Sequence, residues 1–282
     1  MAAPDERSGV VRLVDSSGVS PRLANIRLHP IKSLDPVSVS QARINPSGGL
    51  EYDRAWALYS VDGKWVNGKR TAAIHTIRAK FADDLGSVTI SAPTDARNLP
   101  IRTFAFPDAH EDAAEWFSVF FQQRILVRHS IHGFPDDTIA NGPTIVSKAS
   151  LQAICEWFAG VTLDEARRRF RTSLEIDGVP AFWEDQLFGE SRQEIVRFRI
   201  GEVSFEGSNP CERCPVPPRN PFTGETRDGF QKRFAQLRET NLPPWAPRRA
   251  FDHFYRFTTN TRVPPSETGK LLRAGDVITR QH

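Results

Sequence analysis

The hydrophobic pattern of the first hundred residues predicts a series of short β-strands. From residue 24 to about residue 101, apolar runs such as VSVSQARI (37–44) recur at roughly the 8–12-residue spacing of strands in compact β-proteins. The breaks between them hold turn-forming residues, including Pro-Ser-Gly-Gly at 46–49. Asp62-Gly63 fits a tight hairpin turn. This part of the chain is therefore expected to form a β-barrel or β-sandwich.

Farther along, the apolar residues recur at helical spacing. The segments expected to be helices are 110–125, 147–160, 162–170 and 228–240. In the second of these, Ser147 is a suitable N-cap and Gly160 a suitable stop signal. Strands are expected to return at 172–177, 194–207 and 275–279. The whole pattern predicts a mixed, β-rich α+β protein, preceded by a flexible tail over residues 1–20.

Composition and charge narrow the functional classes. The 282 residues include 37 Lys and Arg against 34 Asp and Glu, so the net charge of +3 does not call for a nucleic-acid partner. No stretch approaches the roughly 18–20 consecutive apolar residues of a membrane span. The three cysteines are too few for a disulfide framework, and the polar N-terminus lacks the apolar run of a signal peptide. We therefore expect a cytoplasmic protein.

Two of the three cysteines, Cys211 and Cys214, lie in the proline-rich segment PCERCPVPPRNPFTGE (210–225), which we expect to be a stiff loop. A zinc site would need further cysteine or histidine ligands nearby, and a thioredoxin-like dithiol would need a helix that the prolines prevent. Arg213 would favour the anionic form of a neighbouring thiol. The residues alone leave two interpretations equally open, an inert structural pair and a thiolate that acts as ligand or nucleophile.

A resemblance to a known family changes this balance. The segment 210–225 is similar to the signature of MOSC-domain proteins, and residues 26–66 resemble the N-terminal β-barrel module of that family. Similarity continues through SKASL (147–151) to LRAGDVI (272–278), so it covers nearly the whole chain. Within the family, the chain is similar to the group that contains the mitochondrial amidoxime-reducing component and its bacterial relatives.

The resemblance implies an architecture and a cofactor. It implies an N-terminal β-barrel-like module over residues 21–125, packed on a MOSC β-barrel with peripheral helices over residues 126–282. It also implies the molybdenum cofactor (Mo-molybdopterin), with Cys214 as metal ligand and catalytic residue and Cys211 as a supporting residue. The other residues implied to bind the cofactor are Lys32, Ser33, Arg54, Asn141, Gly142 and Arg171.

Each of these positions also has an ordinary structural interpretation. Lys32 would be a solvated charge on the first strand, and Asp53 and Arg54 would form a surface ion pair of little energetic weight. The run RRRFR (167–171) is expected to be an exposed helix face apart from Arg171.

The activity implied by the resemblance is the reduction of N-hydroxylated or N-oxide compounds. Electrons would come from a separate cytochrome b5-like or ferredoxin-like donor and its reductase, because the sequence carries no flavin, haem or iron–sulfur motif. Two alternatives stay open. One is a cofactor carrier or sulfur-transfer protein that uses Cys214, and the other is a non-catalytic binding protein on the same scaffold.

Overall fold

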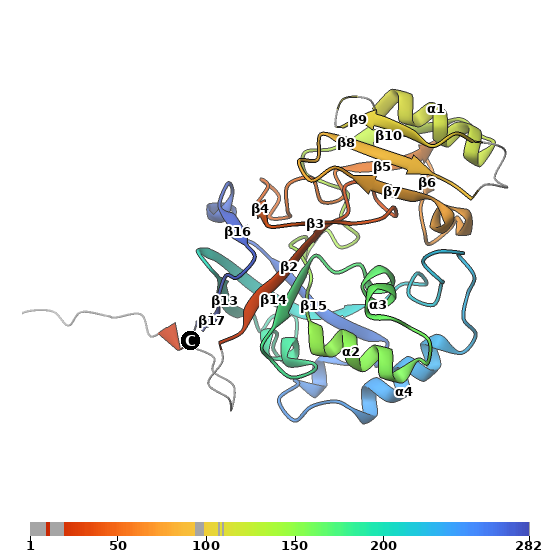
Figure 1. Cartoon of the computed structure of the whole chain (residues 1–282). Helices are drawn as coiled ribbons and strands as arrows, with labels where there is room; N and C mark the ends of the chain where they lie inside the picture. The colour runs from red at the N-terminus through yellow and green to blue at the C-terminus, as the bar shows by residue number, and fades with distance from the viewer. Residues whose placement is uncertain (1–9, 12–19, 94–98, 107, 109, 282) are drawn as a thin grey trace, which may run out of the picture.

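The computed structural model of the chain describes residues 10–11, 20–93, 99–106, 108 and 110–281 (Figure 1). The predicted tail, residues 1–20, lies outside these residues except for 10–11 and 20. The prediction of a mixed, β-rich α+β fold is confirmed, because the described residues form four α-helices and several β-sheets. Among the described residues, no helix has the length and apolar character needed to cross a membrane.

The largest sheet has nine strands, and it joins the two halves of the chain. In spatial order the strands are β1 (Val10–Val11), β17 (Ile278–Gln281), β13 (Val196–Ile200), β14 (Val203–Glu212), β15 (Arg256–Arg262), β11 (Ile145–Ser147), β12 (Leu174–Asp177), β2 (Arg22–Leu28) and β3 (Val37–Val39). β11 and β12 run parallel, and the other neighbours run antiparallel. β2 pairs with β12, with Ile26 opposite Leu174. Main-chain hydrogen bonds therefore connect the N-terminal and C-terminal halves.

Three smaller sheets hold the other strands of the N-terminal half, and one of them includes a strand from near the C-terminus. They are β10 (Ile125–His129) with β5 (Trp56–Ser60) and β6 (Trp65–Val66); β7 (Arg78–Phe81) with β8 (Ser87–Ser91) and β9 (Arg102–Ala105); and β4 (Gln41–Arg43) with β16 (Leu271–Arg273). Helix α1 (His110–Phe121) packs against β10 at the top of Figure 1. Its residues Ala113, Trp116, Phe117 and Phe120 are buried, as the helical spacing predicted. β10 begins at Ile125, so the predicted boundary between residues 125 and 126 falls inside this strand, which pairs with β5 of the N-terminal half.

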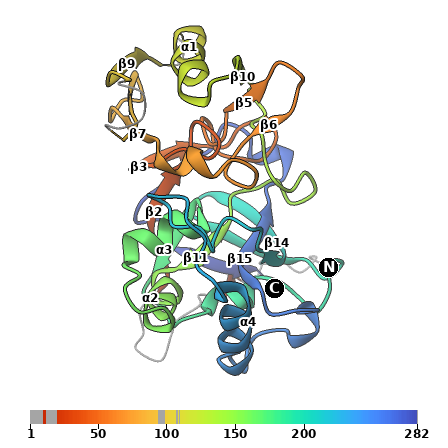
Figure 2. The same cartoon turned by 90° about the vertical axis from the view of Figure 1, so that its right-hand side faces the viewer.

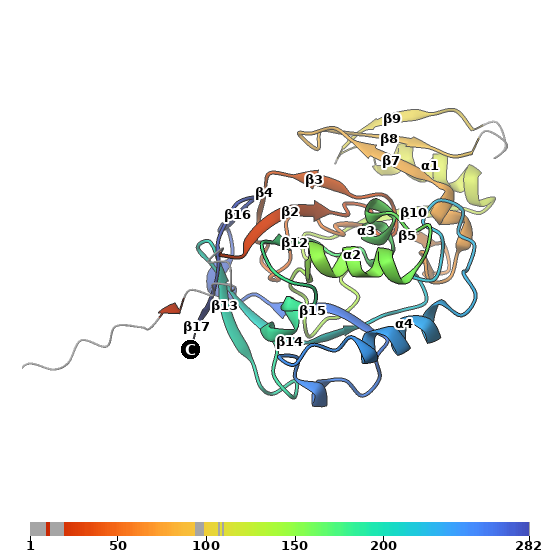
Figure 3. The same cartoon turned by 60° about the horizontal axis from the view of Figure 1, so that its bottom comes forward.

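Three helices accompany the large sheet in the C-terminal half. They are α2 (Lys148–Trp157), α3 (Leu163–Phe170) and α4 (Phe230–Thr240). The predicted N-cap is confirmed, because Ser147 Oγ accepts a hydrogen bond from the backbone N–H of Ser150 at 3.0 Å. Aromatic side chains hold the helices together, with the Phe158 and Phe230 rings stacked 4.3 Å apart. Figure 3 shows α2 and α3 beside β12.

The segment expected to be one strand at 194–207 is two strands, β13 and β14, that turn at residues 201–202. β14 continues to Glu212, so Cys211 lies in a strand, and the prediction that both cysteines occupy a loop is wrong for Cys211. Pro210 is accommodated because the pairing of β14 with β15 is irregular between Pro210 and Glu212. The short 3-10 helices are η1 (Ala72–Thr76), η2 (Trp183–Leu187), η3 (Arg248–Ala250) and η4 (Pro265–Glu267).

Gly207 lies where β14 passes very close to the end of η2. A Cβ atom added at this position would lie 1.6 Å from the carbonyl oxygen of Leu187. We therefore expect Gly207→Ala to lower the free energy of unfolding by about 3 kcal/mol or more, since the backbone must move. Gly63→Ala is the comparison, because nothing lies within 4 Å of its added Cβ and only its positive φ of +77° opposes the change. We expect Gly63→Ala to lower the free energy of unfolding by about 1–2 kcal/mol. Equal urea midpoints for the two variants would contradict the steric argument.

Candidate functional site

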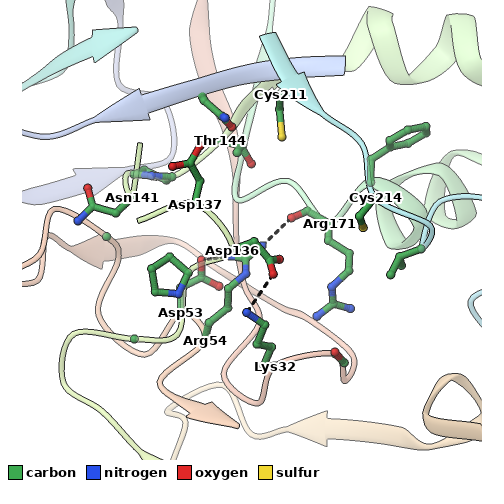
Figure 4. Close-up of a pocket in the computed structure, with 18 of the residues that line it drawn as sticks. Lys32, Asp53, Arg54, Asp136, Asp137, Asn141, Thr144, Arg171, Cys211 and Cys214 are labelled. Carbon is green, nitrogen blue, oxygen red and sulfur yellow. Dashed lines mark hydrogen bonds and ion pairs between the residues drawn. The ribbon is translucent and has the colours of Figure 1, made fainter. Parts of the chain in front are cut away.

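Figure 2 shows the N-terminal strands β5, β6 and β7 above the C-terminal elements α3, β14 and β15. A cavity of about 500 Å³ is lined by residues of both halves of the chain (Figure 4). Its walls come from the turn after β2, the loops that follow β6 and β10, the end of α3, and the end of β14 with the loop after it. Ten lysine and arginine side chains line it, against four aspartate and glutamate side chains. The cavity is therefore suited to an anionic ligand of the size that protein pockets ordinarily bind.

All the site residues taken from the family resemblance line this one cavity. They are Lys32, Ser33, Arg54, Asn141, Gly142, Arg171, Cys211 and Cys214. Their positions in the sequence are widely separated, and the fold brings them together through the pairing of β2 with β12 and of β14 with β15. Their individual roles stay predictions.

Lys32 and Ser33 lie in a turn after β2, which ends at Leu28, so the interpretation that places Lys32 on the first strand is wrong. Lys32 is also not a solvated charge, since only 10% of its side chain is exposed. Its ammonium group donates to the carbonyl oxygen of Phe134 at 2.7 Å and lies 4.8 Å from the centre of the Trp65 ring. Ser33 Oγ accepts a hydrogen bond from the Gly68 N–H at 3.0 Å.

Asp53 and Arg54 form a partly buried pair, with side chains 8% and 19% exposed, rather than the surface pair of the alternative interpretation. Arg54 Nη1 donates to Asp53 Oδ2, and Arg54 Nη2 donates to the carbonyl oxygen of Arg171 at 3.1 Å. Asp53 also accepts from the backbone N–H of His29 at 2.7 Å and from Ser173 Oγ at 3.0 Å. Burial raises the pKa of Asp53, but Arg54 and His29 outweigh it and hold that pKa well below its ordinary value. This network fixes the Arg54 guanidinium at the cavity wall.

Arg171 supplies a hydrogen-bond donor without a protein partner. It follows α3 in a left-handed conformation with φ +50°, which turns the chain into the cavity. Nη1 donates to the carbonyl oxygen of Leu34 at 2.9 Å, whereas Nη2 is buried and makes no hydrogen bond. Burial, with a further contribution from Arg54, lowers the pKa of Arg171 to about 10. In Figure 4 this side chain extends into the space between Lys32 and Cys214, where an anion would satisfy it.

The two cysteines share one fixed cation. Arg213 Nη1 donates to Cys211 Sγ at 3.2 Å, while Nη2 donates to the carbonyl oxygen of Phe170 at 2.6 Å. Burial lowers the pKa of Arg213, but the sulfur atoms of Cys211 and Cys214 outweigh this and raise it. Tyr255 Oη donates to the carbonyl oxygen of Cys214 at 3.4 Å. Both cysteines are free and partly exposed to the cavity. The described residues contain no group of three His, Cys, Asp or Glu side chains arranged for a metal ion.

Asn141 and Gly142 have structural contacts of their own. Asn141 Nδ2 donates to the carbonyl oxygen of Ser47. The backbone N–H of Gly142 donates to the carbonyl oxygen of Thr261 at 2.9 Å. A Cβ atom at Gly142 would lie 2.5 Å from Thr261 Oγ1, so close packing against β15 requires glycine there.

The sequence analysis missed several cavity residues, and one of its expectations about arginines is wrong. Arg169 belongs to the run expected to be an exposed helix face, yet it is 4% exposed. Its Nη1 donates to the carbonyl oxygens of Pro217 at 2.6 Å and Arg219 at 2.7 Å, which holds the loop after Cys214 in place. The spacing of Glu165 and Arg169, which form an i,i+4 ion pair, was the available signal. Asp136 was also missed.

Comparison with known proteins identifies relatives of this chain. It is 28% identical over 292 residues to a molybdenum cofactor sulfurase of Drosophila grimshawi, a match that covers 92% of this chain and 34% of the relative. It is 24% identical over 293 residues to the molybdenum cofactor sulfurase of Drosophila mojavensis, with the same two coverages. A molybdenum cofactor sulfurase of Oryza sativa subsp. japonica is 28% identical over 114 residues, covering 40% of this chain and 13% of the relative. The chain spans about a third of the length of the two fly proteins.

Two domain families match the chain in succession. Residues 20–124 match the MOSC N-terminal beta barrel domain, and residues 131–279 match the MOSC domain. The second match alone covers more than half of the 282 residues. The chain belongs to the MOSC-domain family, and its MOSC domain follows a MOSC N-terminal beta barrel domain.

Proposed function

We propose that the cavity binds the molybdenum cofactor and that Cys214 is its protein ligand to molybdenum. The observation that carries the proposal is the placement of the Cys214 thiol and the unpartnered Arg171 donor on the walls of the same basic cavity. Thiolate sulfur suits a soft or high-valent transition metal, and a planar guanidinium suits a phosphate or the polar edge of a pterin.

Two further arginines at the cavity also have hydrogen-bond donors without partners, which supports the same ligand. Arg213 and Arg219 also line the cavity, and the Nε atom of each is buried without a hydrogen-bond partner. Buried donors without partners are unfavourable, so their presence around one cavity favours a ligand rich in acceptors. Arg171, Arg54 and Arg219 would hold the anionic and polar parts of the cofactor. Arg213 would place a positive charge beside the proposed sulfur ligand.

We further propose that the protein is an oxidoreductase that reduces N-hydroxylated or N-oxide compounds. When bound, the cofactor supplies two-electron oxygen-transfer chemistry at molybdenum. The net reaction converts an N–OH group, two electrons and two protons into N–H and water. The cavity walls would orient the substrate, and the electrons would come from a cytochrome b5-like or ferredoxin-like protein kept reduced by its own reductase.

A second candidate is sulfur transfer to the molybdenum cofactor, or carriage of that cofactor. The names of the sulfurase relatives favour it, as do two free cysteines beside Arg213 in a cavity suited to the cofactor. In this alternative Cys214 would carry sulfur as a persulfide. A binding protein without catalytic activity is the remaining alternative.

The test is elemental analysis for molybdenum together with pterin release, on protein made in a host that synthesises the cofactor. We expect about one molybdenum and one pterin per chain, and reduction of an N-hydroxylated compound when a reduced donor protein is supplied. A persulfide on Cys214 in protein that lacks molybdenum would favour sulfur transfer instead. Protein with neither metal nor pterin, even after reconstitution, would contradict the proposal.

A further inference from the structure

The loop between β10 and β11 carries a carboxylate into the most basic part of the cavity. Asp136 Oδ1 lies 3.1 Å from Lys32 Nζ (Figure 4). It also lies 2.9 Å from Lys69 Nζ, so one oxygen atom bridges two ammonium groups. Partial burial raises the pKa of Asp136, but Lys32 and Lys69 outweigh it and lower that pKa well below its ordinary value. Burial lowers the pKa of Arg171, and the charge of Asp136 partly opposes this change. Asp136 thus occupies the position where an anionic ligand would meet these cations.

Asp136 also holds its own segment against the cavity. Residues 130–144 form neither helix nor strand. On one side, the backbone N–H of Phe134 donates to the carbonyl oxygen of Arg54 at 2.8 Å, and on the other the N–H of Gly142 donates to Thr261. We call residues 135–139, which lie between these anchors, the flap. In this part of the described chain, the hydrogen bonds and ion pairs that join the flap to anything outside the loop are those of Asp136.

Exposure of the Asp136 side chain makes this contact replaceable. It is 53% exposed, whereas the side chain of Lys32 is 10% exposed and fixed by Phe134 and Trp65. Moving Asp136 into water therefore leaves the lysine in place on the cavity wall. The carboxylate regains hydration when it leaves, but the ammonium groups need another anion to replace it.

We infer that Asp136 is a specificity-determining residue, which admits to the cavity a ligand with an anionic group able to replace its carboxylate between Lys32 and Lys69. This inference rests on the proposed function only in taking the cavity as the ligand site. A phosphate group meets the requirement, because its oxygens accept hydrogen bonds from both ammonium groups. Ligand binding then releases the flap. A neutral ligand leaves Asp136 in place and the flap closed.

The test compares the cofactor-free full chain with Asp136→Asn and Asp137→Asn, using inorganic pyrophosphate as the probe in a calorimetric titration. Asp137 is the matched control, because it lines the same cavity but its Oδ1 accepts from the N–H groups of Ile139 and Ala140 within the loop. Removing the competing carboxylate is expected to tighten pyrophosphate binding about tenfold in Asp136→Asn, and Asp137→Asn is expected to stay within about twofold of the natural chain.

Hydrogen exchange of residues 135–139 supplies a second readout. Pyrophosphate is expected to speed exchange of the flap in the natural chain, and Asp136→Asn is expected to show fast exchange without it. The inference is overturned if Asp136→Asn binds pyrophosphate no more tightly than Asp137→Asn, if no form binds it, or if the probe leaves flap exchange unchanged. Neither readout involves molybdenum. If both readouts give the expected result but the chain takes up no molybdenum, only the proposed function is contradicted. If the chain takes up molybdenum but either readout fails, only this inference is contradicted.

Discussion

Replacing Cys214 with alanine is expected to reduce molybdenum-dependent turnover to the uncatalysed background while the protein stays folded. The proposed metal site has one sulfur ligand from the protein, and alanine offers none in its place. The fold should tolerate the change, because the side chain is partly exposed to the cavity and its removal opens no void in a hydrophobic core. The measurements are molybdenum content, pterin content and the rate with a reduced donor protein.

The other two cysteines provide graded controls. Cys155 lies in α2 and contacts the carbonyl oxygen of Leu151, away from the cavity residues, so Cys155→Ala should keep both metal and turnover. Cys211 contacts Arg213 rather than serving as the proposed ligand, and its loss should weaken metal binding or activity by about 10–100-fold, as is usual for groups that support a ligand. Full metal loading and full turnover in Cys214→Ala would rule out the ligand role.

The second large effect is expected in the core of the C-terminal half. Arg238 of α4 forms an ion pair with Asp185, and their side chains are 1% and 2% exposed. The guanidinium lies 4.3 Å from the ring centre of Phe182 and 5.0 Å from that of Phe251. Asp185→Ala leaves this cation buried without its counter-charge, so we expect the free energy of unfolding to fall by about 3–5 kcal/mol in urea titrations.

Two comparisons separate loss of the pair from loss of packing. The double change Asp185→Leu with Arg238→Met removes both charges, and it should recover most of the stability because apolar residues of similar volume replace the pair. Arg248 and Glu239 form a pair with 61% and 52% exposed side chains, so Arg248→Ala should cost less than about 1 kcal/mol. A loss below 1 kcal/mol in Asp185→Ala itself would show that water reaches Arg238.

Elements that are marked by nearby residues, such as helix caps, could be predicted from the sequence. Strands whose buried residues are polar could not. Thr162 and Ser147 mark the starts of α3 and α2, and both side chains accept the capping hydrogen bond. Strand β15, RFTTNTR, reads as a polar segment, yet all but its last residue are buried. Its hydroxyl groups find distant partners: Thr259 donates to the carbonyl oxygen of Glu184 and Thr261 to that of Pro143. Such satisfaction of polar groups depends on the fold and has no signature in the strand itself.

The candidate site also contains residues that could be predicted from the sequence and residues that could not. The resemblance to a family supplied residues such as Lys32 and Cys214, and the fold places them on one cavity. It did not supply Asp136 or the buried contacts of Arg169, because each joins segments far apart in the sequence. From the charge pattern alone, the arginines of α3 in the run RRRFR (167–171) were expected to be exposed to solvent. Their environment is decided by the packing of α3 against the loop after β14.

The pairing of β2 with β12 has a consequence for synthesis of the chain. β2 leaves the ribosome early, but the strand that covers its edge follows only after most of the N-terminal half and two helices have been made. Until then β2 presents unpaired backbone N–H and C=O groups that another nascent chain can bind. Rapid translation or a chaperone that shields this strand would therefore favour monomeric, correctly folded product.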